Sequence, residues 1–207
     1  ISIKGKSAHA MEPEKGRNAA VLLAKFLKTE LETGAGADFV RFVTDVFDGD
    51  HTGATLGFNY YDEMSGETTL NPGIVTFNEK GGAIEVSMRY SVTYPFDEKM
   101  TEVQAHMAET PFILDVAGDS KPHYVREDDE LVQTLLSVYQ KHTNDFSKVL
   151  STGGGTYARV LKKGVAFGML YPGELDVAHQ ADEFVVVDNL LKAAAIYAEA
   201  IVKLASK

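Results

Sequence analysis

Residues 73–93 read GIVTFNEKGGAIEVSMRYSVT, and this stretch decides the fold of the first part of the chain. Two runs with strong β propensity, 73–78 and 83–93, flank the sequence EKGG (79–82), whose paired glycines permit a tight turn. In the second run apolar and polar residues alternate, so the strand has one apolar and one polar face, with Arg89 on the polar face. The stretch predicts an antiparallel hairpin.

Helices and short strands are expected around this hairpin. Apolar residues recur at helical spacing before it, and Asp97 is placed to cap a helix after it. The order β-α-α-β-β-α-β predicts an α+β domain over residues 1–120, an antiparallel sheet with helices on one face. The helices are expected at 17–30, 38–47 and 97–109, and the further strands at 1–6 and 112–116.

A different pattern begins near Lys121, where we expect a domain boundary, so that 121–207 forms a second segment. Helical patterns and short apolar runs alternate here, which is typical of an α/β fold with a parallel sheet. The apolar run 165–171 suits a strand covered on both faces. Helices are expected after Asp128, at 157–163 and from Asp188, with a short strand at 148–151. The last helix is expected to bury Leu190, Leu191, Ala194, Ala195, Ala198, Ile201 and Val202.

Charge and composition exclude several classes of function. The chain has 20 basic and 30 acidic residues without a dense basic run, so nucleic acid is not expected as a partner. It has no cysteine, which excludes disulfides, thiolate metal clusters and a cysteine nucleophile, and which suits a cytoplasmic location. No apolar run approaches the roughly 18 residues of a membrane-spanning helix, so no membrane partner is expected.

The segment STGGGT (151–156) is expected to join a strand to a helix. Exposed amides and a helix N-terminus in such a place can hold an anion such as phosphate or carboxylate. Gly153-x-Gly155-x-x-Ala158 also matches a loose dinucleotide fingerprint, so nucleotide binding is one hypothesis. The alternative is that the glycines only let the turn approach a neighbouring helix.

Two of the six histidines stand in sequence contexts that suggest function. His9 lies in GKSAHA, directly after a predicted strand and among small residues. His179 lies in VAHQADE, in a loop at the carboxyl side of the presumed parallel sheet, where ligands tend to bind. The other four are expected to be solvated and are given no role: His51, His106, His123 and His142.

Several motifs taken together resemble a known family. In chain order these are GKSAHA (5–10), GRNAA (16–20), SMRY (87–90), GGGTYAR (153–159) and VAHQADE (177–183), the last followed by AIYAEAI (195–201). They closely resemble PepV-type dipeptidases, di-zinc exopeptidases similar to carnosinases, aminoacylases and glutamate carboxypeptidases. The resemblance implies a lid domain (1–120) inserted into a zinc-bearing catalytic domain, of which 121–207 is the C-terminal part.

The same resemblance implies a role for individual residues. His9 matches the lid histidine that stabilises the oxyanion of the tetrahedral intermediate, and Arg89 matches the arginine that binds the C-terminal carboxylate of a dipeptide substrate. His179 matches a zinc ligand, and Glu183 matches an acidic residue that supports it. The carboxylate pocket would be completed by Gly154, Gly155 and Thr156.

The chain departs from the family pattern in its metal ligands. The family requires an HxD motif, a bridging Asp, an adjacent Glu-Glu pair and a further Asp, but neither HxD nor Glu-Glu occurs here. One histidine cannot hold two zinc ions, since each needs about three protein ligands. We therefore expect a fragment that is inactive alone and whose partner is the missing N-terminal half of the catalytic domain.

The expected activity of the full-length protein is hydrolysis of short peptides with a free N-terminus by zinc-activated water. A related alternative is deacylation of N-acyl amino acids. An alternative of another class is a non-catalytic lid or dimerisation module, because the chain lacks most of the metal site.

Overall fold

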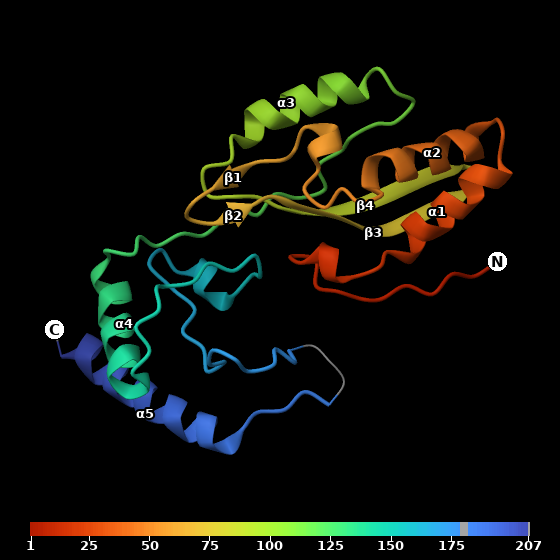
Figure 1. Ribbon diagram of the computed structural model, residues 1–207. Coiled ribbons are helices and arrows are strands. Elements are labelled where there is room, and N and C mark those ends of the chain that lie inside the picture. Colours follow the sequence, from red (N-terminus) through yellow and green to blue (C-terminus); the bar gives the residue numbers. More distant parts are fainter. Residues whose placement is uncertain (179–181, 207) are drawn as a thin grey trace. The chain divides into compact units, whose positions relative to one another are not determined.

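The computed structural model describes residues 1–178 and 182–206, and its contacts divide the chain into two units. Unit 1 is Ile1–Pro122 with Ser151–Gly154, and unit 2 is His123–Leu150 with Gly155–Lys207. Figure 1 shows their elements in chain order. Among the described residues, no helix is both long and apolar enough to cross a membrane.

The predicted hairpin is the main sheet of unit 1. Strands β3 (Thr69–Asn78) and β4 (Gly81–Arg89) pair antiparallel, in a register that runs from Asn78 opposite Gly81 to Thr69 opposite Arg89. The first strand begins four residues earlier than predicted because a shift in register after Pro72 accommodates Gly73 as a bulge. A bulge suits this place, since proline has no N–H for the ladder.

The second strand ends at Arg89 and not at Thr93, because the following backbone amides bond elsewhere. The N–H of Val92 donates to Ser65 Oγ (2.8 Å), and that of Thr93 donates to the Asp62 carboxylate (3.0 Å). Both acceptors belong to a small hairpin of β1 (Tyr61–Asp62) and β2 (Gly66–Glu67), which the sequence pattern did not predict.

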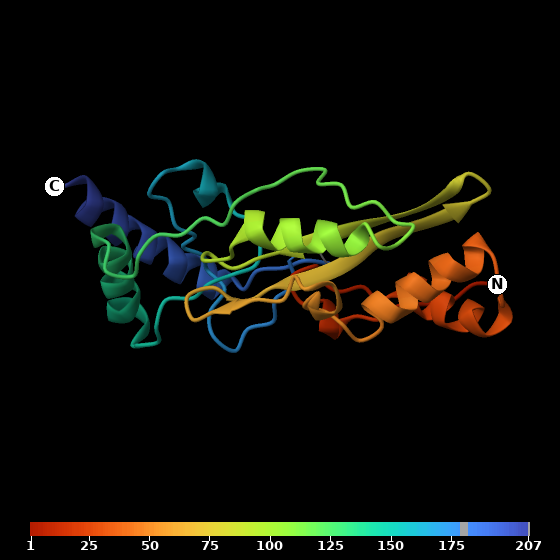
Figure 2. The same ribbon diagram turned by 90° about the horizontal axis from the view of Figure 1, so that it is seen from above.

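Three predicted helices of unit 1 are confirmed: α1 (Ala19–Glu30), α2 (Ala35–Phe47) and α3 (Phe96–Met107). They share one core with the apolar face of the hairpin, which runs beside them in the view of Figure 2. Pro95, and not Asp97, is the N-cap of α3. Two 3-10 turns complete the unit, η1 (Pro13–Lys15) and η2 (Ala54–Leu56). The core is Val21, Ala24, Phe39, Val40, Val43, Val46, Phe47, Phe58, Leu70, Val103 and Met107.

Two predicted strands of unit 1 do not form. Residues 1–6 contribute only an isolated bridge between Lys6 and Arg17. Residues 112–116 have the alternation of a strand, and Phe112 stacks on Phe42 with ring centroids 3.9 Å apart. Within the described residues, however, no neighbouring strand pairs with this segment. Alternation alone places side chains on two faces, but a strand also needs a partner for its backbone.

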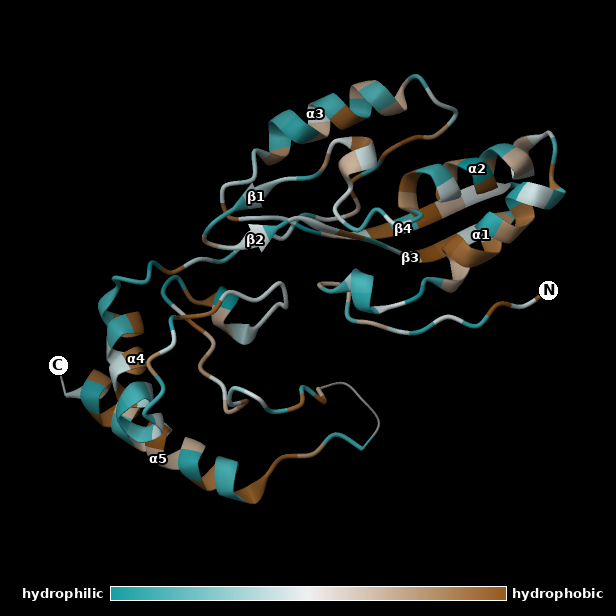
Figure 3. Cartoon of the chain, in the orientation of Figure 1, coloured by the Kyte–Doolittle hydropathy of each residue, from teal (hydrophilic) through white to brown (hydrophobic). Residues whose placement is uncertain are grey.

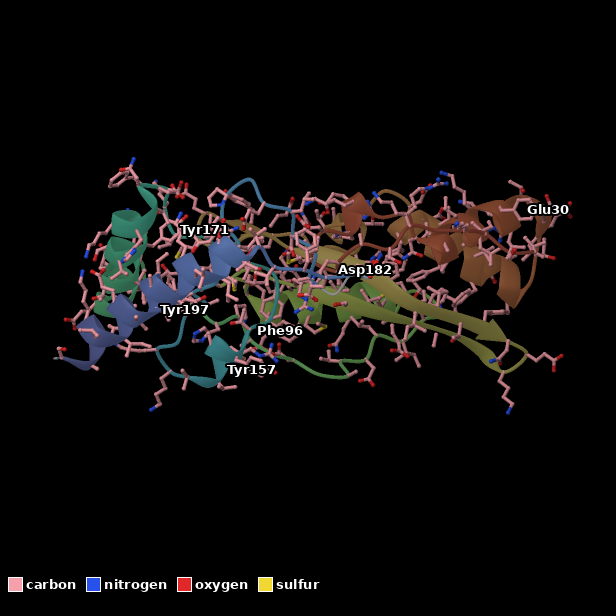
Figure 4. All side chains as sticks on the ribbon, turned by 90° about the horizontal axis from the view of Figure 1, so that it is seen from below. Glu30, Phe96, Tyr157, Tyr171, Asp182 and Tyr197 are labelled. Carbon is pink, nitrogen blue, oxygen red and sulfur yellow. The ribbon has the colours of Figure 1, made fainter. Side chains whose placement is uncertain are left out.

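Unit 2 is built on α4 (Glu130–Thr143) and α5 (Val187–Ala205), both of which were predicted. Its described residues contain no sheet, so the expected strands 148–151 and 165–171 and the parallel sheet are wrong there. The run 165–171 is extended and packs alternate side chains on the helices. Tyr197 donates from α5 to the carbonyl of Phe167 (2.9 Å), and Figure 4 labels Tyr171 and Tyr197 beside α5.

The face of α5 that packs on α4 differs from the predicted one. The buried residues are Ala193, Ile196 and Ala200, at helical spacing. All seven residues that were predicted to be buried in this helix are exposed instead, and Figure 3 shows brown, hydrophobic segments along α5. A helix that is apolar on several faces is typical of a helix buried on several sides. The large exposed residues are Leu190 (47%), Leu191 (65%), Ile201 (66%) and Val202 (63%).

The carboxylate of Asp62 fastens the end of β4 to the β1–β2 hairpin. It accepts hydrogen bonds from the N–H (2.6 Å) and hydroxyl (2.7 Å) of Ser65 and from the hydroxyl of Thr93 (2.9 Å), besides the Thr93 amide. Burial acts to raise the pKa of Asp62, but the hydrogen bonds from Ser65 and Thr93 outweigh it and lower this pKa to about 2. The ionised form is therefore the one that the fold stabilises.

We predict that Gly82→Ala destabilises unit 1 by about 1–3 kcal/mol. A Cβ at this position would lie 2.4 Å from the buried ring of Phe39, which cannot move without disturbing the core. Gly73→Ala is the matched control in the same hairpin, because its Cβ meets no atom closer than 3.8 Å. Hydrogen exchange of the β3 and β4 amides measures the effect. Equal protection in both variants would contradict this packing.

We predict that Asp62→Asn lowers stability near neutral pH and that the difference from the unsubstituted chain shrinks in acid. The folded-state pKa of about 2 lies below the ordinary 3.8. The carboxylate therefore stabilises the fold above about pH 4, and this contribution is lost as the pH falls toward 2. Urea denaturation at a series of pH values measures it, with the exposed Asp115→Asn as control. A difference that is independent of pH would contradict the assigned network.

Candidate functional site

The polar face of the β3–β4 hairpin carries one of the predicted site residues, Arg89. Because side chains alternate along a strand, Met88 packs against the helical core and its neighbour Arg89 lies on the opposite face. The residue opposite Arg89 in the register is Thr69. The end of the hairpin thus places a guanidinium and a hydroxyl residue side by side.

Arg89 has an unused donor in a partly buried position. Its Nε atom is buried and has no hydrogen-bond partner within the described part of the chain. The same residues provide no ion pair for Arg89 either. A buried donor without a partner costs about 1–3 kcal/mol. An incoming acceptor such as a carboxylate would relieve this cost.

The segment that carries His9 is attached to the same strands. The hydroxyl of Thr69 donates to the carbonyl of Ala10 (3.5 Å). Because Thr69 is the residue opposite Arg89, this bond attaches the residue next to His9 to that end of the hairpin. Further along, the side-chain amide of Asn18 donates to the carbonyl of Pro72 (2.8 Å) while its oxygen caps α1. Hence two hydrogen bonds from strand β3 fix the chain between His9 and α1.

His9 itself is exposed, with one ring nitrogen engaged. Its Nδ1 accepts a hydrogen bond from the backbone N–H of Met11 (3.2 Å), and its carbonyl accepts one from the N–H of Glu12 (2.9 Å). These two bonds form a tight turn that holds the imidazole on the surface of unit 1. The predicted accessibility of His9 agrees with this position.

Part of the glycine segment packs on this turn. Residues Ser151–Gly154 belong to unit 1, where a Cβ built on Gly153 would lie 2.9 Å from the Cβ of Met11. Thr152 Oγ1 lies 3.8 Å from the sulfur of Met11. The N–H of Gly154, one of the amides predicted to bind a carboxylate, donates to the Thr152 hydroxyl (3.1 Å). Unit 1 therefore brings His9, Arg89 and Gly154 onto connected segments.

The rest of the glycine segment belongs to unit 2. Both Gly155 and Thr156 are exposed, and they precede η3 (Tyr157–Val160). The predicted helix 157–163 is reduced to this single 3-10 turn. The chain then returns so closely to it that a Cβ on Gly164 would lie 2.5 Å from the carbonyl oxygen of Ala158. Neither the strand nor the helix that a dinucleotide fingerprint requires is present, so the nucleotide hypothesis loses its structural context.

A cation that was not among the predicted site residues lies beside Gly155. The Arg159 guanidinium is 3.0 Å from the position that a Cβ on Gly155 would take. The positive charge of Arg159 complements the anion-binding character proposed for the segment. The sequence could have indicated Arg159, because it is the final residue of the motif GGGTYAR and lies four residues after Gly155.

The residues predicted to bind metal do not form a centre in the described structure. His179 lies outside the described residues, and Glu183 is exposed. Within residues 1–178 and 182–206, no group of three or more His, Asp or Glu side chains is placed to hold a metal ion. A zinc site needs three or four ligands, so these residues do not fit a complete zinc centre by themselves.

Two histidines that were expected to be solvated have structural partners. His142 on α4 pairs with Glu199 on α5 (2.8 Å), and His123 Nε2 bonds to the carbonyl of Gly164 (2.6 Å). Hydrogen bonds from Lys141 and His142 lower the pKa of Glu199 to about 2. These contacts join elements of unit 2 and leave both histidines without a catalytic assignment.

Comparisons with known proteins agree with the predicted resemblance. The model of Peptidase family M20/M25/M40 matches residues 14–203. "Putative dipeptidase YtjP" of Bacillus subtilis is 47% identical over 99% of this chain and 44% of its own length. Proteins also named putative dipeptidases, from Staphylococcus saprophyticus and Staphylococcus epidermidis, are 34% and 35% identical over 99% and 97% of this chain.

The chain spans less than half the length of these relatives, 44%, 44% and 43% respectively. The match nevertheless covers almost the whole of this chain, and the family model extends through both units. The resemblance to a dipeptidase-type peptidase, read from five short motifs, is therefore confirmed at the level of the family. The chain belongs to Peptidase family M20/M25/M40.

Proposed function

We propose that this chain is part of a dipeptidase that hydrolyses short peptides with a free N-terminus. Membership of the peptidase family and the names of the relatives support peptide hydrolysis. The observation that carries the proposal is the polar end of the β3–β4 hairpin. There Arg89, whose Nε has no hydrogen-bond partner among the described residues, lies opposite Thr69, and Thr69 bonds to the residue beside His9.

Arg89 is proposed to bind the C-terminal carboxylate of the substrate. Its guanidinium is planar and can offer two parallel N–H donors to one carboxylate, which a lysine ammonium cannot do. The buried Nε supplies one such donor, already desolvated before substrate arrives. An arginine at this place favours peptides whose carboxylate lies a short, fixed distance from the scissile bond, and thus dipeptides.

His9 is proposed to stabilise the oxyanion that develops on the scissile carbonyl. The attack of water on a peptide carbonyl moves negative charge onto its oxygen, and an N–H donor aimed there lowers the barrier. The exposed ring of His9, held at Nδ1 by Met11, is suited to donate from Nε2. Gly154, Gly155 and Thr156 are proposed to help bind the substrate carboxylate, which would take the place of the Thr152 hydroxyl as the acceptor of the Gly154 amide.

The proposal assigns two zinc ions to the complete protein. When bound, they would activate the attacking water. His179 is the one ligand proposed from this chain, with Glu183 as its acidic support, and the remaining ligands are proposed to come from the part of the full-length polypeptide outside the matched region. The curated relatives have more than half of their length there. Alone, this chain is expected to be inactive.

The exposed apolar side chains of unit 2 support such a partner. Leu191, Ile201 and Val202 on α5 are each more than 60% exposed, although the buried side of the same helix is already packed on α4. The run 165–171 likewise pairs with no strand among the described residues. Both features suit a surface that the rest of the catalytic domain covers, by helix packing and by strand pairing.

We predict that His9→Ala in the full-length protein lowers kcat about 10²- to 10³-fold, because one oxyanion donor is removed. Its zinc content should not change, since His9 is not proposed as a ligand. The exposed His106→Ala on α3 is the matched control. Turnover of a dipeptide and of its N-acetylated form, with metal analysis, measures these effects. Unchanged turnover would contradict the role, and a preference for the N-acetylated form would indicate a deacylase.

We predict that this chain recovers dipeptidase activity only when it is combined with the remainder of the full-length protein. Leu191→Asp should weaken co-purification of the two parts at least about tenfold, because it places a charge on the proposed contact surface. Ile113→Asp, at a 95% exposed position of unit 1, is the control. Association unaffected by Leu191→Asp would contradict the assignment of this surface.

A further inference from the structure

We infer that Met11 is a positioning residue for His9. Its backbone amide selects the tautomer of the imidazole, and its side chain joins the His9 turn to the glycine segment 151–154. This inference rests on the proposed function, in which His9 must act as a hydrogen-bond donor.

The tautomer follows from one hydrogen bond. The N–H of Met11 donates to His9 Nδ1 (3.2 Å), so this nitrogen must offer its lone pair. A neutral imidazole that accepts at Nδ1 carries its proton on Nε2. Within the described part of the chain, Nε2 makes no hydrogen bond, and the ring is exposed. The Nε2–H group therefore remains available to an incoming ligand.

This tautomer is the one that the proposed chemistry requires. An oxyanion is stabilised by an N–H that points at it, whereas the opposite tautomer would present a lone pair and repel the developing charge. The backbone bond also limits rotation of the ring, because Nδ1 must stay in line with the Met11 amide. A single main-chain donor thus sets both the protonation site and the direction of the imidazole.

The side chain of Met11 also packs against the glycine segment 151–154. A Cβ on Gly153 would lie 2.9 Å from the Met11 Cβ, so only glycine permits this approach. The sulfur lies 3.8 Å from Thr152 Oγ1 and 3.8 Å from the position of a Cβ on Gly154. Methionine is unbranched and polarizable, and it fills such irregular gaps well. Displacement of this side chain should therefore also disturb the His9 turn.

Nuclear magnetic resonance of this 207-residue chain tests the hydrogen bond without any need for turnover. At about pH 8.5, where an imidazole is neutral, we expect the His9 proton on Nε2 and a scalar coupling between the Met11 amide nitrogen and His9 Nδ1. Met11→Leu, which keeps the amide, should retain both signals, and Met11→Pro, which has no N–H, should lose the coupling. A proton on Nδ1, or no coupling in the unsubstituted chain, would overturn the inference.

Kinetics of the full-length protein test the consequence. Met11→Pro should lower kcat about 10- to 100-fold with little change in KM. The reason is that a misoriented His9 would lose its hydrogen bond to the oxyanion, which forms only in the transition state. Gly153→Ala should act in the same direction by displacing Met11, whereas Gly118→Ala, with no atom within 4 Å of the added Cβ, should not. If His9→Ala slows turnover but Met11→Pro and Gly153→Ala do not, the positioning role is wrong. If His9→Ala itself has no effect, the proposed function fails instead.

Discussion

The antiparallel pairing of β3 with β4 is the constraint on which unit 1 depends. Because successive side chains of a strand point to opposite faces, one register assigns Leu70 and Met88 to the helical core and Thr69 and Arg89 to the other face. A slip of one residue would reverse both assignments. The burial of the apolar face against α1, α2 and α3 therefore also determines where the polar pair lies.

Contacts in unit 1 join the ends of the hairpin strands to segments that are distant in sequence. Thr69 holds the carbonyl of Ala10, Asp62 holds the residues after Arg89, and Met11 contacts Gly153. In each contact one partner is a backbone group or a glycine. The donors on these connected segments, a guanidinium and an imidazole, are those that recognise a carboxylate and a developing oxyanion.

Much of this could be predicted from local sequence patterns, and the failures have physical causes. Helices bury a stripe of apolar residues that repeats every 3.6 residues. Each of α1, α2, α4 and α5 could therefore be predicted from its own residues alone. Strands require a partner that the local pattern does not reveal, and the alternating run 112–116 and the apolar run 165–171 remain unpaired among the described residues. The exposed face of α5 was misassigned for the same reason, since periodicity cannot say which of two apolar faces meets α4.

The candidate site divides in a similar way. Short motifs identified His9 and Arg89. The residues that connect them are Thr69, Ala10 and Met11, and none of these has a side chain that predicts a catalytic or binding role. Arg159 became visible only through its contact with Gly155. The roles of Glu183 and of His179, which lies outside the described residues, depend on ligands that this chain does not supply and stay predictions.

The register of the hairpin can be measured directly, because the chain has no cysteine of its own. Residues paired across antiparallel strands have Cα atoms about 4.5–5.5 Å apart, within the range of a disulfide. We predict that the variant Asn71→Cys/Ser87→Cys, paired in the register, forms an intrachain disulfide under mild oxidation. The variant Asn71→Cys/Glu85→Cys should not. Efficient cross-linking of the second pair and not the first would contradict the placement of Arg89 opposite Thr69.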